Sequence, residues 1–370
     1  MKVTYLPLIG FVSVTAVIYF AVRFDTNELS PCPARKVPVE AKVEHVVSNL
    51  PEPKSGRVHV AIFSGRWKFL RVLLSYIHRE LRQNGGVVDR VLFVMIKYTN
   101  ETLGKLHNLS TVANSVFNDE VFTFLYTRTD SQTHVDMDLH PFFVTFYYHM
   151  LQHLQRNPSD VYFKVDDDIV YLSPNVFSTM LKNKNSSECF IHFGNIVTNW
   201  RCNRYHEKIG VYDSEVNPKG LKMDRGIWPN CGWRSAECAE MILRAFVHHY
   251  HRKTLHRYVS DRRILLNLPR DHGARTSINF IQLDVDLFDY RKMLETGPIH
   301  DDEHWLTVKY SRKEKRPNCI VGHALVVHFG YGPTVQKMLD IGLLKEFENI
   351  ALLELNGTLP KWFRKVTDYS

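Results

Sequence analysis

The sequence has few of the groups that build structural zinc sites or nucleic-acid surfaces. It contains six cysteines, with no Cys-x-x-Cys pair and no histidine-rich ligand spacing, so a structural zinc site is not expected. Basic residues are scattered and the net charge of +8 is modest. Scattered basic residues argue against nucleic-acid binding, whereas a modest positive charge would favour the binding of an anionic small molecule.

One long uncharged stretch lies near the amino terminus. Residues 5–22 carry no charged side chain and could cross a rather thin bilayer as a helix. We find no small-x-small cleavage site there, so we predict a transmembrane anchor over residues 5–23, in preference to a cleaved signal peptide. Residues 1–4 would form a short cytosolic tail. The remainder would lie in the lumen of the Golgi or the ER, as in a single-pass type II membrane protein.

The chain beyond the anchor divides by composition. Residues 24–56 are rich in proline and charge and are interpreted as a stem. Residues 57–370 could form a substantial core, as one large α/β domain or two smaller ones. We expect one luminal domain with a nucleotide-sugar half, 57–185, and an acceptor half, 186–370.

Two further features agree with a luminal location. The cysteines would allow one or two disulfides in an oxidising compartment, with the pairing left open. Glycosylation sequons begin at four asparagines, which only slightly favours secretion because the triplet is short: Asn100, Asn108, Asn185 and Asn356.

The hydrophobic pattern alternates between strands and helices. In the first half, strands are predicted at 57–63, 91–96, 121–126 and 160–165, and helices at 67–83 and 142–154. In the second half, strands are predicted at 189–197, 277–283 and just before His328, and helices at 236–250 and 334–353. This order predicts an α/β fold with a mostly parallel sheet and helices on both faces. Ligands of such sheets bind beyond the carboxyl ends of the strands.

Three consecutive carboxylates, Asp166–Asp168, stand between two apolar runs at 161–165 and 169–172. When desolvated, such a cluster needs protons, basic partners or a metal ion. Oxygen ligands without a neighbouring histidine or cysteine favour Mg²⁺ or Mn²⁺ over zinc. The cluster falls at one predicted strand end, and Ser64–Arg66 falls at another.

Other residues compete for the same role. Asp136–Asp138 and Asp284–Asp286 also have the Asp-x-Asp spacing, and the second follows an apolar run, but we favour Asp166–Asp168 as the metal motif. His328 ends an apolar strand and would lie at the rim of the sheet, although it could be a core histidine, and His323 is its nearest substitute.

A second acidic cluster, Asp301–Glu303, follows the turn at Gly297-Pro298. Its carboxylates could be catalytic. They could equally be the charges that favour a helix start, where they offset the dipole of the amino terminus.

The run Lys164–Leu172, with its three aspartates, resembles the DxD region of Golgi glycosyltransferases of the GT-A fold, especially the β1,3-galactosyltransferase and fringe-like group. The layout of tail, anchor, stem and Rossmann-like half is similar too. Asp301–Glu303 resembles the acidic motif that supplies the base in inverting members, and His328 resembles the late histidine that completes their metal site. The pattern around both also resembles an uncharacterised group known mainly from fungi, and the full galactosyltransferase motif ending in Glu-Asp-Val and Gly is missing.

The resemblance implies a GT-A fold and a metal-dependent, inverting transfer of a sugar from a nucleotide sugar, with UDP as the expected nucleotide. Mn²⁺ or Mg²⁺ would be the cofactor, and a hydroxyl of a glycan, glycoprotein or glycolipid would be the acceptor. The implied metal ligands are Asp166, Asp168 and His328; the implied nucleotide contacts are Ser64, Gly65, Arg66, Asp166 and Asp167; the implied base is Asp302, with Glu303 second. The alternative is a non-catalytic luminal or secreted protein that keeps the fold and binds a metal or a carbohydrate.

Overall fold

The computed structural model describes residues 56–95, 99–126, 159–184, 189–223, 231, 234–261, 263–266, 275–284, 302–330, 332–355 and 358–368. The expected tail and anchor, nearly all of the expected stem and the expected helix at 142–154 lie outside them. No helix among the described residues is long and apolar enough to cross a membrane.

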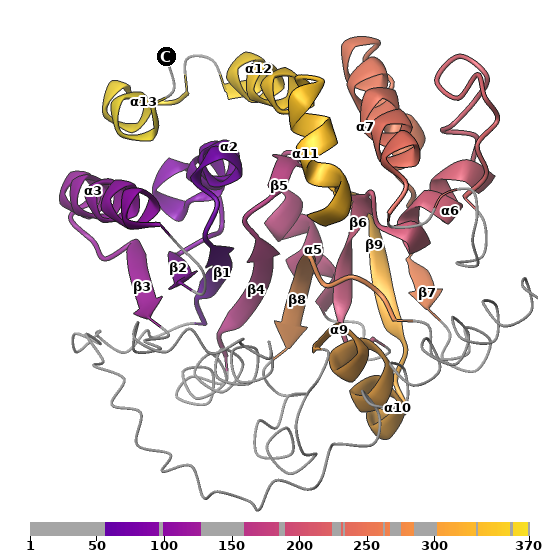
Figure 1. Ribbon diagram of the computed structural model, residues 1–370. Coiled ribbons are helices and arrows are strands. Elements are labelled where there is room, and N and C mark those ends of the chain that lie inside the picture. The colour runs from indigo at the N-terminus through magenta and orange to yellow at the C-terminus, as the bar shows by residue number, and fades with distance from the viewer. Residues whose placement is uncertain are drawn as a thin grey trace, which may run out of the picture. The chain divides into compact units, whose positions relative to one another are not determined.

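Nine strands form one sheet in the order β3-β2-β1-β4-β8-β6-β9-β5, with β7 also paired to β9 (Figure 1). Their bounds are β1 Val58–Ser64, β2 Arg90–Met95, β3 Phe122–Tyr126, β4 Val161–Asp166, β5 Ile169–Leu172, β6 His192–Val197, β7 Ile264–Leu266, β8 Phe280–Asp284 and β9 Asn318–His328. Every residue of β2 and of β6 is buried, so both faces of the sheet are covered at these strands. The strands expected from the apolar runs are therefore confirmed to within a few residues.

The prediction of a mostly parallel sheet is right for the strands β1 to β4. There β1 is parallel to β2 and β4, and β2 is parallel to β3. Of the other strands, β8 is antiparallel to both of its neighbours, and β5 and β7 are antiparallel to β9. The physical reason is clearest at β5, because two residues, Asp167 and Asp168, separate it from β4. A parallel crossover needs a dozen or more residues.

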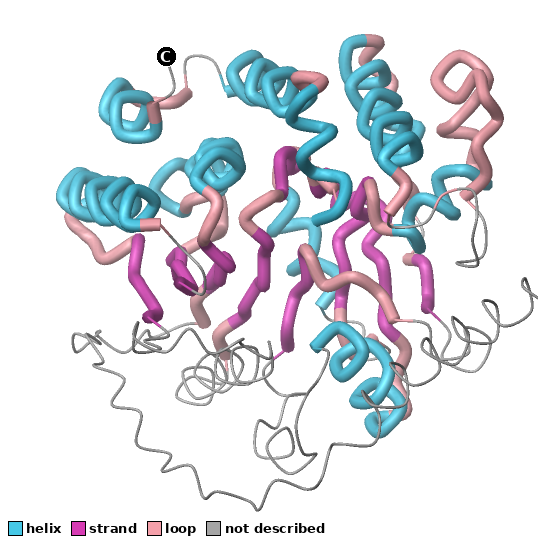
Figure 2. Tube along the Cα trace, viewed as in Figure 1, coloured by secondary structure: helices cyan, strands magenta, loops and turns pink. Residues whose placement is uncertain are grey.

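Helices flank this sheet (Figures 1 and 2). Their bounds are α2 Trp67–Glu80, α3 Asn100–Phe117, α5 Val176–Lys184, α6 Trp200–Lys208, α7 Ala236–His251, α9 Asp302–His304, α10 Ser311–Glu314, α11 Gly332–Asp340, α12 Leu343–Leu355 and α13 Lys361–Thr367. The prediction of a single helix at 334–353 is wrong. Gly342 adopts a φ of 78°, which ends the helical run, so two helices, α11 and α12, cover this segment.

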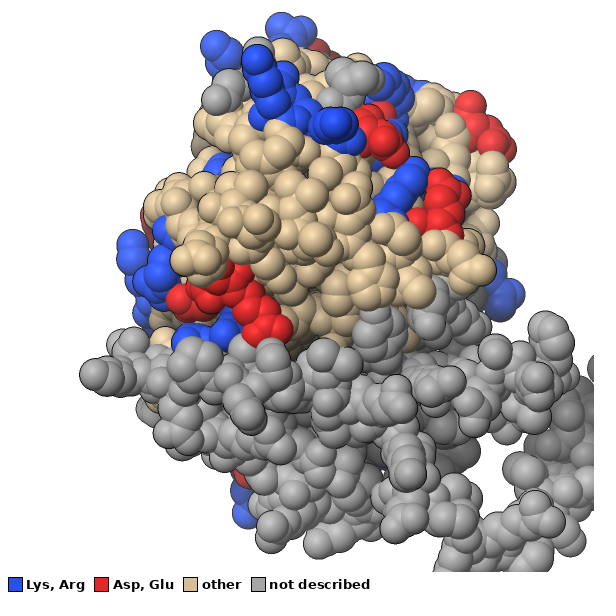
Figure 3. All heavy atoms as spheres, turned by 90° about the vertical axis from the view of Figure 1, so that its left-hand side faces the viewer, with Lys and Arg blue, Asp and Glu red and all other residues tan. Residues whose placement is uncertain are grey.

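Helix α3 was not predicted, although its signals are present. The Thr99 side chain accepts a hydrogen bond from the Thr102 amide at 3.1 Å, which caps the first turn. Leu106, Leu109 and Ala113 follow at helical spacing and are buried. Lys105 bridges Glu101 and Asp368 and so joins α3 to the end of α13. Figure 3 shows one face of the molecule, on which charged side chains of both signs lie around a large area that has none.

Two disulfides hold the second half. Cys189–Cys319 joins the chain just before β6 to the start of β9, and Cys231–Cys238 closes a short loop at the start of α7. Cys202 is free and buried in α6. The pairing that the sequence left open is thus assigned.

Candidate metal and nucleotide site

The fold brings the ends of several strands to one edge of the sheet. The strands β1, β4, β6 and β9 all run in the same direction, since β8 is antiparallel to both β4 and β6, and β6 is parallel to β9. Ser64, Asp166 and His328 are the last residues of β1, β4 and β9. The expectation that they share an edge is confirmed.

The short strand β5 completes the arrangement. Ile169 pairs with His328, and the Asp168 carbonyl accepts a hydrogen bond of 2.9 Å from the Phe329 amide. The turn at Asp167 and Asp168 is therefore attached to the end of β9. This attachment places a carboxylate beside the histidine, although 160 residues separate them in the chain.

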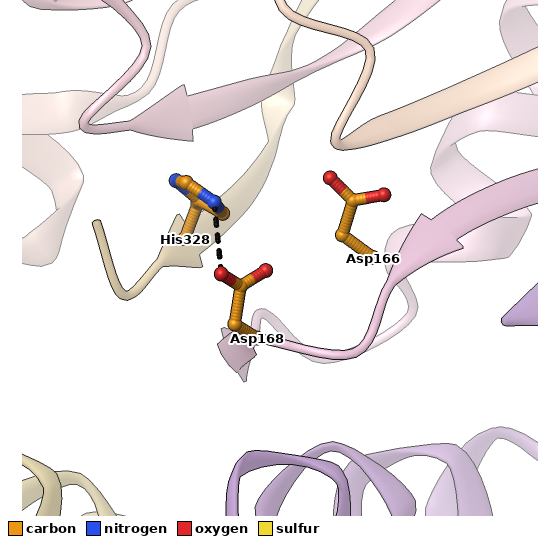
Figure 4. A group of neighbouring side chains, drawn as sticks. All are labelled: Asp166, Asp168 and His328. Atoms are coloured by element: carbon orange, nitrogen blue, oxygen red, sulfur yellow. Dashed lines mark ion pairs between the residues drawn. The ribbon is translucent and has the colours of Figure 1, made fainter. Parts of the chain in front are cut away.

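Asp166, Asp168 and His328 converge at this edge (Figure 4). One ligand atom of each lies within 4.8 Å of the others, and among the described residues this is the one group of three histidine, cysteine or acidic side chains arranged so closely. His328 Nε2 lies 3.3 Å from Asp168 Oδ2. Two carboxylates and an imidazole are ligands that suit Mn²⁺, and Mg²⁺ accepts the carboxylates.

Asp168 gives the clearest indication that this group could bind a cation. Its side chain is only 4% exposed, and its Oδ1 atom is buried without a hydrogen-bond partner among the described residues. Burial alone would raise the pKa of Asp168, but His328 and Arg66 outweigh burial and hold the pKa well below its usual range. A buried, ionised carboxylate with one oxygen unpaired has unused capacity for a metal ion.

Asp166 is held by two groups that the sequence reasoning missed. The Lys164 ammonium pairs with Oδ1, and the Asn279 amide donates to Oδ2 at 2.7 Å. Lys164 is itself buried and donates to the Ile278 carbonyl at 2.9 Å. A charged residue in an apolar strand was the available signal for Lys164. Asn279 could be found only from the register of β8.

Asp167 points the other way and supports the start of α2. Its Oδ2 accepts hydrogen bonds from the backbone amides of Gly65 and Arg66, at 3.0 and 2.8 Å. Its Oδ1 accepts from Arg66 Nε at 2.9 Å. The Arg66 side chain does not cap α2, and Asp167, from the turn between β4 and β5, instead accepts from the two amides just before the helix.

Arg66 is divided between two aspartates. Besides Asp167, its guanidinium lies 3.0 Å from Asp168 Oδ2, and its side chain stays 43% exposed. Burial lowers the pKa of Arg66, but the negative charges of Asp168 and Asp167 together have the larger, opposite effect. The net pKa is raised, so the guanidinium stays charged. Ser64 is buried, and its hydroxyl donates to the Ile62 carbonyl at 3.1 Å. The expected nucleotide contacts therefore lie next to the cluster, and Arg66 is the most exposed of them.

His328 is buried at the end of β9. Burial lowers the pKa of the imidazole, but Asp168 outweighs this effect and raises the pKa above its ordinary value. The other ring nitrogen, Nδ1, lies 3.0 Å from the Thr198 hydroxyl. Both nitrogens of the ring therefore have defined neighbours.

The second acidic cluster lies elsewhere in the second half. Asp302 is largely buried at the start of α9, and its Oδ1 accepts a hydrogen bond from the Glu303 amide at 2.9 Å. Glu303 pairs with Arg275 at 2.7 Å. The described residues show no contact between these carboxylates and Asp166 or Asp168. Asp301 lies outside the described residues.

The two competing residues that the structure describes, Asp284 and His323, do not join the cluster. Asp284 pairs with Val161, the first residue of β4, and so lies at the opposite edge of the sheet from Asp166. His323 is exposed in the middle of β9 and lies 2.6 Å from Asp261. Asp136, Asp138 and Asp286 lie outside the described residues.

Comparisons with known proteins give a distant likeness in fold. No family model and no curated protein matches the sequence. The chain is similar to the 4-diphosphocytidyl-2C-methyl-D-erythritol synthase of Anaerococcus prevotii DSM 20548, with 8% identity, 78% of this chain and 98% of that chain covered, and a TM-score of 0.36. It is also similar to GalNAc-T7, crystallised with UDP, GalNAc and Mn²⁺, with 10% identity, 86% of this chain and 55% of that chain covered, and a TM-score of 0.42. Both TM-scores are below 0.5, so what this chain does has to be inferred from its own residues.

Proposed function

We propose that this protein is a metal-dependent glycosyltransferase, which moves a sugar from a nucleotide sugar to a hydroxyl of a glycan, glycoprotein or glycolipid. The observation that carries the proposal is the convergence of Asp166, Asp168 and His328 at the carboxyl edge of the sheet, with one buried oxygen of Asp168 unpaired. The expected nucleotide is UDP, and the fold that we propose for this protein is the GT-A fold.

The site fits Mn²⁺ or Mg²⁺, which Asp166, Asp168 and His328 would hold. Such an ion supplies positive charge to the diphosphate as it leaves the sugar. Arg66 is placed to add a second positive charge, because it lies beside Asp168 and keeps nearly half of its side chain exposed. Asp167 keeps Arg66 and the start of α2 in position for that role.

An acceptor hydroxyl needs a base, and Asp302 remains the first candidate with Glu303 the second. The segment from Arg275 to Asn279 supports this choice, because it connects the two acidic regions. Asn279 donates to Asp166, and Arg275 donates to Glu303. Four residues span at most about 14 Å of backbone, so this segment links the regions of α9 and Asp166 through a short stretch of chain. An attack assisted by a base on the side of the sugar opposite the diphosphate would invert the anomeric centre.

The proposed location is the lumen of the Golgi or the ER, with the chain anchored through residues 5–23. The two disulfides support an oxidising compartment, since such bonds are rare in the cytosol. The anchor itself remains an inference from the uncharged stretch.

The test is nucleotide release by the purified full-length protein with Mn²⁺ and a panel of nucleotide sugars. We expect slow hydrolysis of one donor, and a loss of about 100-fold or more in Asp168→Asn, because even the partners of a metal ligand are typically worth 10–100-fold. Asp284→Asn is the matched control at the opposite edge and should stay active. If no donor is bound or hydrolysed, the proposal is wrong and a non-catalytic binding protein is favoured.

A further inference from the structure

Thr198 has an unusual backbone conformation beside the proposed site. It follows β6 directly and adopts a φ of 78°, which is rare for any residue other than glycine and an outlier for a β-branched one. The residue is buried, with 1% of its surface exposed. Such a conformation persists only where the surroundings enforce it.

Neighbouring side chains enforce it here. The Asn203 side-chain carbonyl accepts a hydrogen bond of 3.2 Å from the Thr198 amide, and the Tyr212 hydroxyl donates to the same oxygen at 3.1 Å. Asn199 caps α6 by accepting from the Arg201 amide at 2.9 Å. The turn from β6 into α6 is therefore held on both sides of Thr198.

The result is a hydroxyl aimed at His328. Because Val197 pairs with Val327 in parallel strands, Thr198 lies next to His328. Its Oγ1 lies 2.9 Å from the His328 carbonyl oxygen and 3.0 Å from His328 Nδ1. A hydroxyl has one hydrogen and a carbonyl can only accept, so the hydroxyl donates to the carbonyl and accepts from Nδ1–H. The neutral ring then has its lone pair on Nε2, the atom that faces Asp168.

We propose that Thr198 is a positioning residue that holds His328 in the Nδ1–H tautomer, so that Nε2 is the atom available to a divalent metal ion. This inference rests on the proposed function, because it assigns a role within the same metal site. Metal-bound histidines generally donate their second nitrogen to an oxygen acceptor, which fixes the ring orientation and the tautomer. Here a hydroxyl is the acceptor, and the strained turn is what brings it there.

The test is Mn²⁺ affinity, measured on the full-length protein from the electron paramagnetic resonance signal of free Mn²⁺. Thr198→Val keeps the β-branched shape and removes the hydroxyl, and we expect it to weaken binding by about 10–100-fold. Thr198→Ser keeps the hydroxyl and should bind nearly as wild type. The metal-free melting temperatures of the two variants should be similar, and Thr198→Ala replaces the valine variant if that one does not fold.

A double-mutant cycle shows whether Thr198 acts through His328. The variant His328→Ala should bind Mn²⁺ weakly, and adding Thr198→Val to it should weaken binding no further. Full additivity of the two changes, or wild-type affinity in Thr198→Val, would overturn the inference while leaving the proposed function in place. A wild-type protein that binds no Mn²⁺ would overturn both.

Discussion

The two halves of the chain support the proposed site by different means. In residues 57–185 the carboxylates are held by cations: Asp167 by Arg66, and Asp166 by Lys164. In residues 186–370 the groups behind His328 are neutral, since Thr198 and Asn203 are uncharged and buried. The difference follows the chemistry of the ligands. Adjacent carboxylates repel unless cations offset their charge, whereas a neutral imidazole needs only an acceptor for its one N–H, which leaves the lone pair on the other nitrogen.

The halves also differ in covalent cross-links, because both disulfides lie in residues 186–370. Removing each disulfide tests how much it stabilises that half. Cys189–Cys319 closes 130 residues of chain, whereas Cys231–Cys238 closes 7. From loop-closure entropy, replacing the first pair by alanine should cost about 5 kcal/mol in the free energy of unfolding, and the second about 2 kcal/mol. Urea denaturation of both double variants measures the difference. Equal losses would show that the long link is not what stabilises the second half.

The charged support of the first half can be removed at Asp167. Asp167→Asn takes the negative charge from a pair in which Asp167 is buried and Arg66 is 43% exposed, and it leaves Arg66 facing only Asp168. Because solvent screens the exposed partner, we expect a loss of about 2 kcal/mol in the free energy of unfolding, mainly from the charged hydrogen bonds that Asp167 accepts. The control is Asp213→Asn, which breaks a partly exposed pair with Arg257 and should cost less than about 1 kcal/mol. Denaturant unfolding measures both. A loss at Asp167 no larger than at Asp213 would mean that the pair is not a structural support.

How far the sequence predicts the site differs between the halves as well. Asp166–Asp168 could be recognised because the carboxylates are adjacent and follow an apolar strand, and both features are local. His328 was placed at the rim for the same reason. Thr198 and Asn279 could not be found, since each reaches its partner through strand register across 130 and 113 residues. The antiparallel direction of β8 could not be predicted either, because local periodicity carries no information on strand direction.

A buried neutral histidine in the second half, His206, should make the stability of the protein sensitive to pH. The imidazole is buried in α6, its Nε2 lies 2.8 Å from Asn195 Oδ1, and burial lowers its pKa to about 3. Because this pKa is below the unfolded value of about 6.5, the unfolded chain takes up a proton first as the pH falls. The stability is therefore complete above about pH 6.5 and is lost progressively below it, by about 2 kcal/mol at pH 5. Comparing urea unfolding at pH 7 and pH 5 should show that His206→Gln, which cannot titrate, loses about 2 kcal/mol less than wild type between the two. An unchanged pH dependence in the variant would mean that this histidine takes up its proton as readily in the folded protein as in the unfolded chain.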